Sequence, residues 1–241
     1  MTYCVATMIN AGIIFASDSR TNAGIDNIST FCKMKTFEHA GDRALVIVSS
    51  GNLAITQAAL NHLDQNIKCN VEPNLMSVRS MYEVAELIGI ALREVRLRDG
   101  AFLAESNVDS KASFIVGGQI AGESQRLFLV YSEGNFIEAT PETPYFQIGE
   151  VKYGKPIIDR VIRPDTCVND AIKGVLVSFD STMRSNISVG MPIDMACYNR
   201  DSLRLNQIYR FDDQDNYFQR LRQSWAEGVR HAFSQLPNFE R

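Results

Sequence analysis

The sequence has little excess charge of either sign, and this excludes the classes of protein that depend on such an excess. Its 241 residues include 24 basic and 28 acidic side chains, for a formal charge of -4. Binding to a phosphate backbone depends on clustered lysine and arginine. We therefore expect no nucleic acid partner.

Cysteine and histidine are also few and scattered. The three histidines and five cysteines show neither Cys-x-x-Cys nor His-Glu-x-x-His spacing, and no glycine-rich phosphate loop occurs. This pattern predicts reduced thiols, no metal site and no organic cofactor. A disulfide framework, a metal hydrolase and a nucleotide-binding protein are thereby disfavoured.

Long apolar runs and linker-like segments are absent too. No run approaches the length of a membrane span, and no basic segment precedes an apolar stretch at the N-terminus. We therefore expect a cytoplasmic protein that does not contact membranes. Because no Pro-rich or Ser-rich stretch divides the chain, we interpret 1–241 as one domain.

Two hairpins are predicted before any helix. Apolar runs at Tyr3–Ile9 and Gly12–Ser17 flank a two-residue turn, and strands at Lys33–Glu38 and Ala44–Ser50 flank a turn around Gly41. Both faces of the first hairpin are apolar. Its sheet must therefore be covered on both sides.

Beyond the hairpins, helices and strands alternate in blocks. Helical spacing predicts helices at Leu53–Ile67, Val84–Val95 and Val168–Phe179, the last capped by Asp165 or Thr166. Further strands are predicted at Ala112–Ile120, Arg126–Ser132, Asn135–Thr140, Pro192–Tyr198 and Leu203–Ile208. Two sheets packed face to face with helices outside, a four-layer αββα sandwich, would bury all these faces.

A charged C-terminal segment follows. We treat 209–241 as a helical extension whose stripe is Phe218, Leu221, Trp225 and Val229. Packing on its own domain is favoured over binding a partner.

Hairpin geometry predicts a site near the N-terminus. The first hairpin places Asp18 beside Thr2, and the second places Lys33 across from Ser49, close to Gly51. If the two hairpins share a sheet, these residues converge at one end.

Removal of Met1 would give Thr2 both a hydroxyl nucleophile and a free α-amino group as its base. A lysine ammonium nearby lowers the pKa of such an amine, and a carboxylate keeps that lysine charged. We therefore assign Asp18 and Lys33 to tuning and orienting the amine, and the Gly51 N–H to stabilising the oxyanion. The implied reaction is amide hydrolysis through an acyl-enzyme.

Each of these residues also has a purely structural interpretation. Asp18 suits the end of a strand, and Lys33 suits a solvated strand face. Lys35 shares that face and is a rival to Lys33. Cys4 shares the face of Thr2 and is interpreted as core packing.

At these residues the sequence resembles the proteasome β-subunit family of N-terminal nucleophile hydrolases, and within it the bacterial Anbu group. The resemblance rests on Thr2, the segment 12–20, the segment 32–34 and the segment 49–52. It implies the αββα fold, a threonine hydrolase with Thr2, Asp18, Lys33 and Gly51 in the roles above, and assembly of like subunits into a ring or open spiral.

Two family motifs are altered. Gly149–Gly154 stands where the family has Ser-Gly-Gly, and Arg184–Gly190 stands where it has Asp-x-x-Ser-Gly, which makes Ser188 a further candidate. Whether Glu150 and Asn186 or Ser188 replace the auxiliary serines stays open at this point.

The leading hypothesis is thus a self-compartmentalising peptide hydrolase. The alternatives are a catalytically weak or inactive scaffold or binding ring, and an amidohydrolase acting on small molecules. The substrate preference is unassigned. Without a phosphate loop, any ATP-driven unfoldase must be a separate protein.

Overall fold

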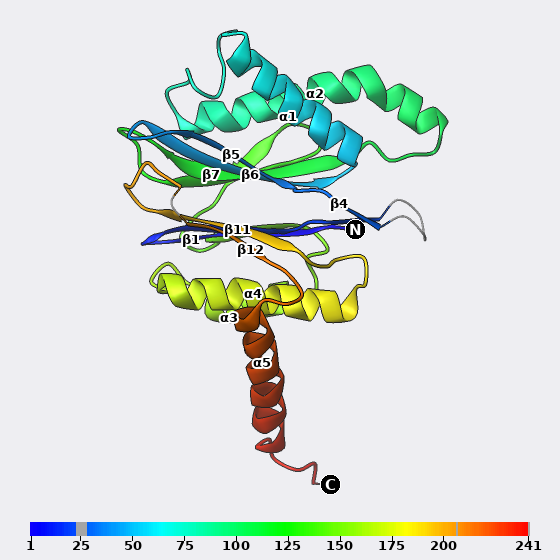
Figure 1. Ribbon diagram of the computed structural model, residues 1–241, viewed down its shortest axis with the longest axis vertical. Coiled ribbons are helices and arrows are strands. Elements are labelled where there is room, and N and C mark those ends of the chain that lie inside the picture. Colours follow the sequence, from blue (N-terminus) through cyan, green and yellow to red (C-terminus); the bar gives the residue numbers. More distant parts are fainter. Residues whose placement is uncertain (23–27, 206, 241) are drawn as a thin grey trace.

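The structure, a computed structural model, describes residues 1–22, 28–205 and 207–240. Two sheets lie between two pairs of helices in four layers (Figure 1). The outer helices are α1 (Leu53–Lys68) and α2 (Met81–Glu105) on one side, and α3 (Lys155–Val161) and α4 (Val168–Ser185) on the other. The αββα sandwich predicted from the sequence is therefore confirmed.

Each sheet of the sandwich has five antiparallel strands. In spatial order, the first sheet contains β10 (Tyr145–Gly149), β1 (Tyr3–Ile9), β2 (Gly12–Asp18), β11 (Ile193–Asn199) and β12 (Gln207–Phe211). The second contains β5 (Met34–His39), β6 (Arg43–Gly51), β7 (Ala112–Ile120), β8 (Arg126–Val130) and β9 (Phe136–Glu138). A short pair, β3 (Arg20–Asn22) and β4 (Ile28–Thr30), follows β2.

The registers of both predicted hairpins are confirmed, but their placement in one sheet is wrong. Cys4 pairs with Ser17, and Met34 pairs with Val48. The β1–β2 hairpin lies in one sheet and the β5–β6 hairpin in the other. Because β1 and β2 are apolar on both faces, they need cover from a second sheet, and the second hairpin belongs to that sheet.

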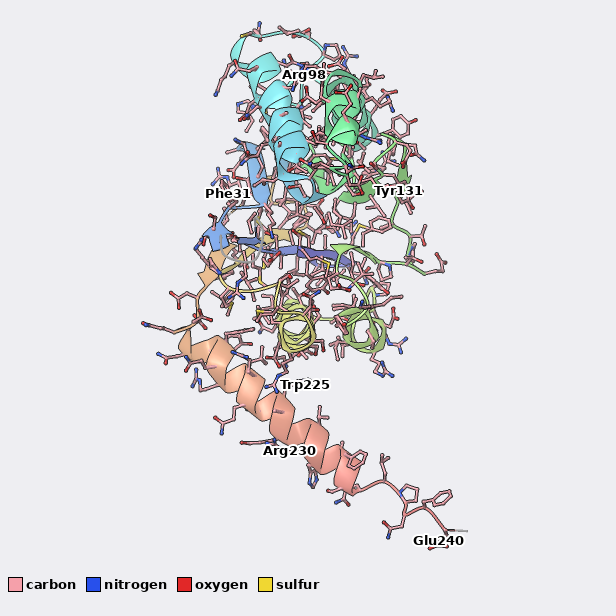
Figure 2. The ribbon with its side chains drawn as sticks, turned by 90° about the vertical axis from the view of Figure 1, so that its right-hand side faces the viewer. Phe31, Arg98, Tyr131, Trp225, Arg230 and Glu240 are labelled. Carbon is pink, nitrogen blue, oxygen red and sulfur yellow. The ribbon has the colours of Figure 1, made fainter. Side chains whose placement is uncertain are left out.

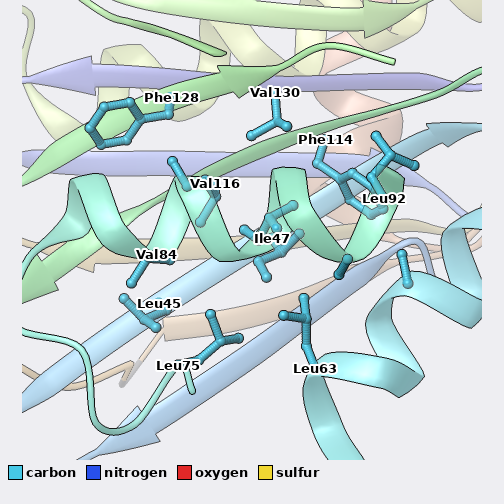
Figure 3. Packing of buried hydrophobic residues seen from close by; sticks show 14 of the residues in the cluster. Leu45, Ile47, Leu63, Leu75, Val84, Leu92, Phe114, Val116, Phe128 and Val130 are labelled. Carbon is cyan, nitrogen blue, oxygen red and sulfur yellow. The ribbon is translucent and has the colours of Figure 1, made fainter. Parts of the chain in front are cut away.

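Three apolar clusters fill the spaces between the four layers. One joins α1 and α2 to the β5–β9 sheet, where Leu45 and Ile47 pack with Val84 and Leu92 (Figure 3). A second lies between the sheets and includes Phe15 of β2. The third joins α3 and α4 to the first sheet. The N-terminal strand is thus buried on both faces.

The other predicted elements are largely confirmed, with two corrections. The cap of α4 is Cys167, without a side-chain hydrogen bond, whereas the Thr166 hydroxyl accepts the backbone N–H of Arg163 at 2.8 Å. The last strand lies at Gln207–Phe211, whereas the sequence predicted it at Leu203–Ile208. The predicted range includes residue 206, which lies outside the described residues. The short elements β3, β4, β10 and α3 were not predicted.

The C-terminal helix α5 (Asn216–Ser234) points away from the sandwich (Figures 1 and 2). Phe218 in its first turn is buried, but the exposed fraction rises to 36% at Trp225 and 74% at Phe233. An ion pair between Arg222 and the buried Asp180 of α4, at 2.7 Å, holds the base of the helix. The prediction that this helix lies on its own domain is therefore wrong for its second half.

No helix among the described residues is both long and apolar enough to cross a membrane.

Candidate active site

The main chain of Thr2 is held from two sides. On one side the backbone N–H of Tyr3 donates to Asp18 Oδ1 at 3.0 Å, as the register of the first hairpin predicts. On the other side the Thr2 carbonyl accepts the backbone N–H of Glu150 at 2.7 Å. Thr2 itself is half-buried. The residue is therefore fixed by β2 and by the end of β10, close to the start of the chain.

A buried ion pair lies directly behind this residue. Lys33 Nζ is 2.8 Å from Asp18 Oδ1, the same oxygen that accepts the Tyr3 N–H. Both side chains are almost fully buried. The ammonium also donates to the Arg20 carbonyl at 2.7 Å. Two of its three hydrogens are thus placed, and among the described residues the third has no acceptor.

The electrostatics of Asp18 reflect this burial. Desolvation raises the pKa of the Asp18 carboxyl, and the charge and hydrogen bond of Lys33 oppose that rise. A buried carboxylate is stable only if it is paired and hydrogen-bonded. Lys33 is therefore required for an ionised Asp18 at this position.

Three of the predicted residues, Thr2, Lys33 and Gly51, border one cavity of about 380 Å³, and Asp18 lies behind Lys33 outside its lining. Its walls come from the start of β1, the β2–β3 segment, the end of β6 and the first turns of α1. They are Met1, Thr2, Arg20, Thr21, Lys33, Ser49, Ser50, Gly51, Leu53, Thr56 and Gly149. Thr2, Lys33 and Gly51 thus meet at this cavity, although they come from different sheets.

Two glycines at the cavity have conformations that other residues rarely adopt. Gly51 has a φ of 110°, and a Cβ there would lie 2.3 Å from the Lys111 carbonyl oxygen. Gly149 has a φ of 83°, and its Cβ would lie 2.0 Å from the Thr2 carbonyl oxygen. Close backbone approach at both positions therefore requires glycine.

We expect Gly51→Ala to lower the free energy of unfolding by about 1–3 kcal/mol or more, because strain at positive φ adds to a steric clash. The matched control is Gly41→Ala, since Gly41 also has a positive φ of 83° but no atom within 4 Å of its Cβ position. Thermal denaturation of both variants measures the difference. Equal losses in the two variants would show that the contact with Lys111 is unimportant.

The rival residues lie elsewhere. Lys35 pairs with Asp64 of α1 at 2.7 Å and does not line the cavity. Cys4 is fully buried between the sheets, and burial raises the pKa of its thiol far above the ordinary value. Ser188 is half-buried and outside the cavity lining, and its backbone N–H donates to Asn186 Oδ1 at 2.9 Å. Ser188 therefore does not line the cavity at Thr2.

Sequence reasoning singled out Glu150 and Asn186 but did not predict their contacts. Glu150 is buried, and its carboxylate accepts the Asn186 side-chain amide at 2.9 Å and lies 3.4 Å from Lys152 Nζ. Since the Glu150 N–H donates to the Thr2 carbonyl, this group supports the main chain of Thr2. Register information for β10 would have been needed to predict the contact between Glu150 and Thr2, because Gly149 pairs with Tyr3. No cluster of metal-ligating side chains occurs in the described ranges.

The αββα sandwich, with the second residue of the chain and a buried lysine at one cavity, is the arrangement of a proteasome β-subunit-like protein. No family model matches the chain, and a search of curated proteins finds no match. Solved structures do match. The chain is 49% identical to Anbu (ancestral β-subunit) from Yersinia bercovieri, with 99% of each chain covered and a TM-score of 0.92.

Two further structures agree. A helical assembly of the Anbu complex from Pseudomonas aeruginosa is 49% identical, covers 99% of this chain and 98% of its own, and has a TM-score of 0.94. An Anbu (Gly-1) mutant from Hyphomicrobium sp. strain MC1 is 46% identical over 100% of both chains, with a TM-score of 0.93. The chain therefore belongs to the Anbu family of proteasome β-subunit-like proteins.

Proposed function

We propose that the chain is a threonine hydrolase that cleaves peptide or related amide bonds with Thr2 after removal of Met1. The observation that supports this most is the buried Lys33–Asp18 pair, tied to the Tyr3 N–H and bordering the same cavity as Thr2. Burying an ion pair costs free energy, so its presence at the cavity of Thr2 favours a functional role over a purely structural one.

In the proposed reaction, Thr2 Oγ attacks the substrate carbonyl carbon while the Thr2 amine takes the hydroxyl proton. The Lys33 ammonium favours the neutral amine, and the third N–H of Lys33 is available to the nucleophile. The N–H of Gly51 stabilises the oxyanion. The protonated amine then gives its proton to the leaving nitrogen, and water hydrolyses the acyl-enzyme to restore Thr2.

The state of the N-terminus tests the first requirement of this proposal. Met1 lines the cavity, so its removal would place the free amine of Thr2 there. We expect intact-mass measurement of protein from its native cell to show a chain that starts at Thr2. Retained Met1 would contradict the hydrolase and favour the scaffold. The scaffold is the second candidate function. The observation that favours it is the hydrogen bond between Asn186 and Glu150, which stand where proteasome β-subunits have auxiliary serines.

We also propose that the chain assembles with copies of itself. The support is the related structure described as a helical assembly of the Anbu complex, together with the exposed apolar stripe on the outer half of α5. A reducing, cytoplasmic location is proposed as well, because all five cysteines are free thiols.

The outer half of α5 provides the test of assembly. We expect Val229→Ser with Phe233→Ser to lower the mass in solution by dissociating the assembly, because these side chains are 46% and 74% exposed and offer apolar area to a neighbour. Leu221 is less suitable, since it packs on the core of its own chain. Light scattering after size exclusion gives the mass, with Arg230→Ser as the control on the same helix (Figure 2). An unchanged mass would reject α5 as the contact.

A further inference from the structure

A second hollow, of about 300 Å³, adjoins the cavity at Thr2. The two share Ser50, Gly51 and Gly149, so they meet at the proposed oxyanion position. The second hollow is otherwise lined by Lys111, Ala112, Ser113, Leu129, Tyr131, Gln147, Ile148 and Val151. If Thr2 cleaves a bond whose carbonyl lies at Gly51, the substrate has room to extend into a hollow on each side of it.

The charge of this combined surface is of one sign. Arg20 and Lys33 line the first hollow and Lys111 lines the second, and among the described residues neither lining includes an aspartate or glutamate. The protein as a whole is acidic, with a formal charge of -4. Because Asp18 neutralises Lys33, the positive character of this surface comes from Arg20 and Lys111, which attract anionic groups.

These three cations differ in their availability. Lys33 is neutralised by Asp18, and Arg20 donates to the Ile187 carbonyl at 3.0 Å. Lys111 is exposed, and among the described residues its ammonium has no ion-pair partner. Its main chain is fixed, because its carbonyl accepts the Asn52 N–H at 2.8 Å beside Gly51.

The second hollow also contains an uncharged donor. Tyr131, on the side of the sandwich (Figure 2), lines this hollow, and within the described residues its hydroxyl has no hydrogen-bond partner. The Gln147 amide, in contrast, already donates to Tyr3. Lys111 and Tyr131 line the same hollow, so an ammonium and a phenol hydroxyl are both available there to donate hydrogen bonds to a carboxylate.

We propose that the second hollow binds a carboxylate of the substrate through Lys111 and Tyr131, so that the enzyme prefers acidic peptides on one side of the cleaved bond. This inference rests on the proposed hydrolase function. The carboxylate is either an Asp or Glu side chain or the C-terminal carboxylate of a short peptide, because both offer the same chemistry to an ammonium.

The test uses quenched fluorescent peptides that carry Asp or Lys at single positions before and after the cleaved bond. We expect wild-type protein to cleave the Asp peptide with a kcat/KM about fivefold higher than the Lys peptide at positions on one side, the order of effect of one accessible ion pair. Lys111→Glu should reverse this preference, and Tyr131→Phe should weaken it. Lys68→Glu is the matched control, since Lys68 is exposed, has no ion pair among the described residues and lines neither hollow.

Peptides with a free or amidated C-terminus distinguish the two sources of the carboxylate. If wild-type protein prefers the peptide with a free C-terminus and Lys111→Glu removes this preference, the hollow binds the C-terminal carboxylate. If Lys111→Glu instead removes a preference for Asp, the hollow binds the Asp side chain. Either result supports the proposal. Hydrolysis that requires Thr2 but keeps the same charge preference in Lys111→Glu would overturn it, whereas hydrolysis that persists in Thr2→Ala would overturn the proposed function itself.

Discussion

Thr2→Ala is expected to abolish amide hydrolysis and covalent labelling by β-lactone or epoxyketone electrophiles, a loss of about a thousandfold or more. Alanine removes the hydroxyl while keeping the small second residue, so removal of Met1 is not affected. The main-chain contacts of Thr2 with Glu150 do not use its side chain. Folding and assembly should therefore be unchanged.

The matched variant is Thr2→Ser, which restores a hydroxyl next to the α-amino group. We expect it to retain labelling at a reduced rate, because the same nucleophile and base remain. Labelling is measured by intact mass, and hydrolysis by release of a fluorescent product. Labelling of equal extent in Thr2→Ala and wild type would contradict the assignment of the nucleophile.

Lys33→Met should reduce stability as well as activity. The substitution keeps an unbranched chain in the buried position but leaves Asp18 without its partner ion. Breaking a buried ion pair on one side costs about 3–5 kcal/mol. The same change removes the cation proposed to lower the pKa of the Thr2 amine. Urea denaturation and a hydrolysis assay measure the two effects. A variant as stable as wild type would show that the pair is not needed to bury Asp18.

The loss in Lys33→Met should also depend on pH. Burial raises the pKa of Asp18, and without Lys33 only the backbone N–H groups of Tyr3 and Gly190 oppose this rise. When the pKa of a carboxyl is higher in the folded state than in the unfolded state, the protein loses stability as the pH rises from the unfolded-state pKa to the folded-state pKa. The gap in unfolding free energy between wild type and Lys33→Met should therefore narrow as the pH falls through the raised pKa of Asp18 in the variant, where this carboxylate takes up a proton. The double variant Lys33→Met with Asp18→Asn should lose this dependence.

The parts of the fold that could be predicted from the sequence are those with local signals. Both hairpins have short turns that fix their register, and the predicted pairing of Lys33 with Ser49 is present, with the Ser49 N–H donating to the Lys33 carbonyl at 3.0 Å. The assignment of the hairpins to one sheet failed because sheet membership depends on long-range partners. Here β2 pairs with β11, and β6 pairs with β7.

The candidate site was predictable in its residues but not in its construction. Thr2, Asp18, Lys33 and Gly51 come together because ends of strands from two packed sheets meet, not because one sheet contains all four. The support from Glu150 depends on β10, a strand of five residues that was not predicted from the sequence. Its contact with Asn186 spans 36 positions in the chain, and no local rule indicates it.

The direction of α5 could not be derived from its sequence either. An apolar stripe specifies that one face is to be covered, but not whether the cover comes from the same chain or from another. Phe218 and the Arg222–Asp180 ion pair attach only the base of the helix. The remainder of the helix extends beyond this attachment point and leaves Phe233 exposed.

Thr2 is tested as the nucleophile most directly by mapping the adduct formed with a peptide epoxyketone, a reagent that reacts with both a hydroxyl and an adjacent amine. We expect a single adduct on a peptide that begins at Thr2 and lacks Met1, with the reagent joined to both the hydroxyl and the α-amino group of that residue. An N-terminal peptide that retains Met1 without modification, or an adduct at any other residue, would contradict this assignment.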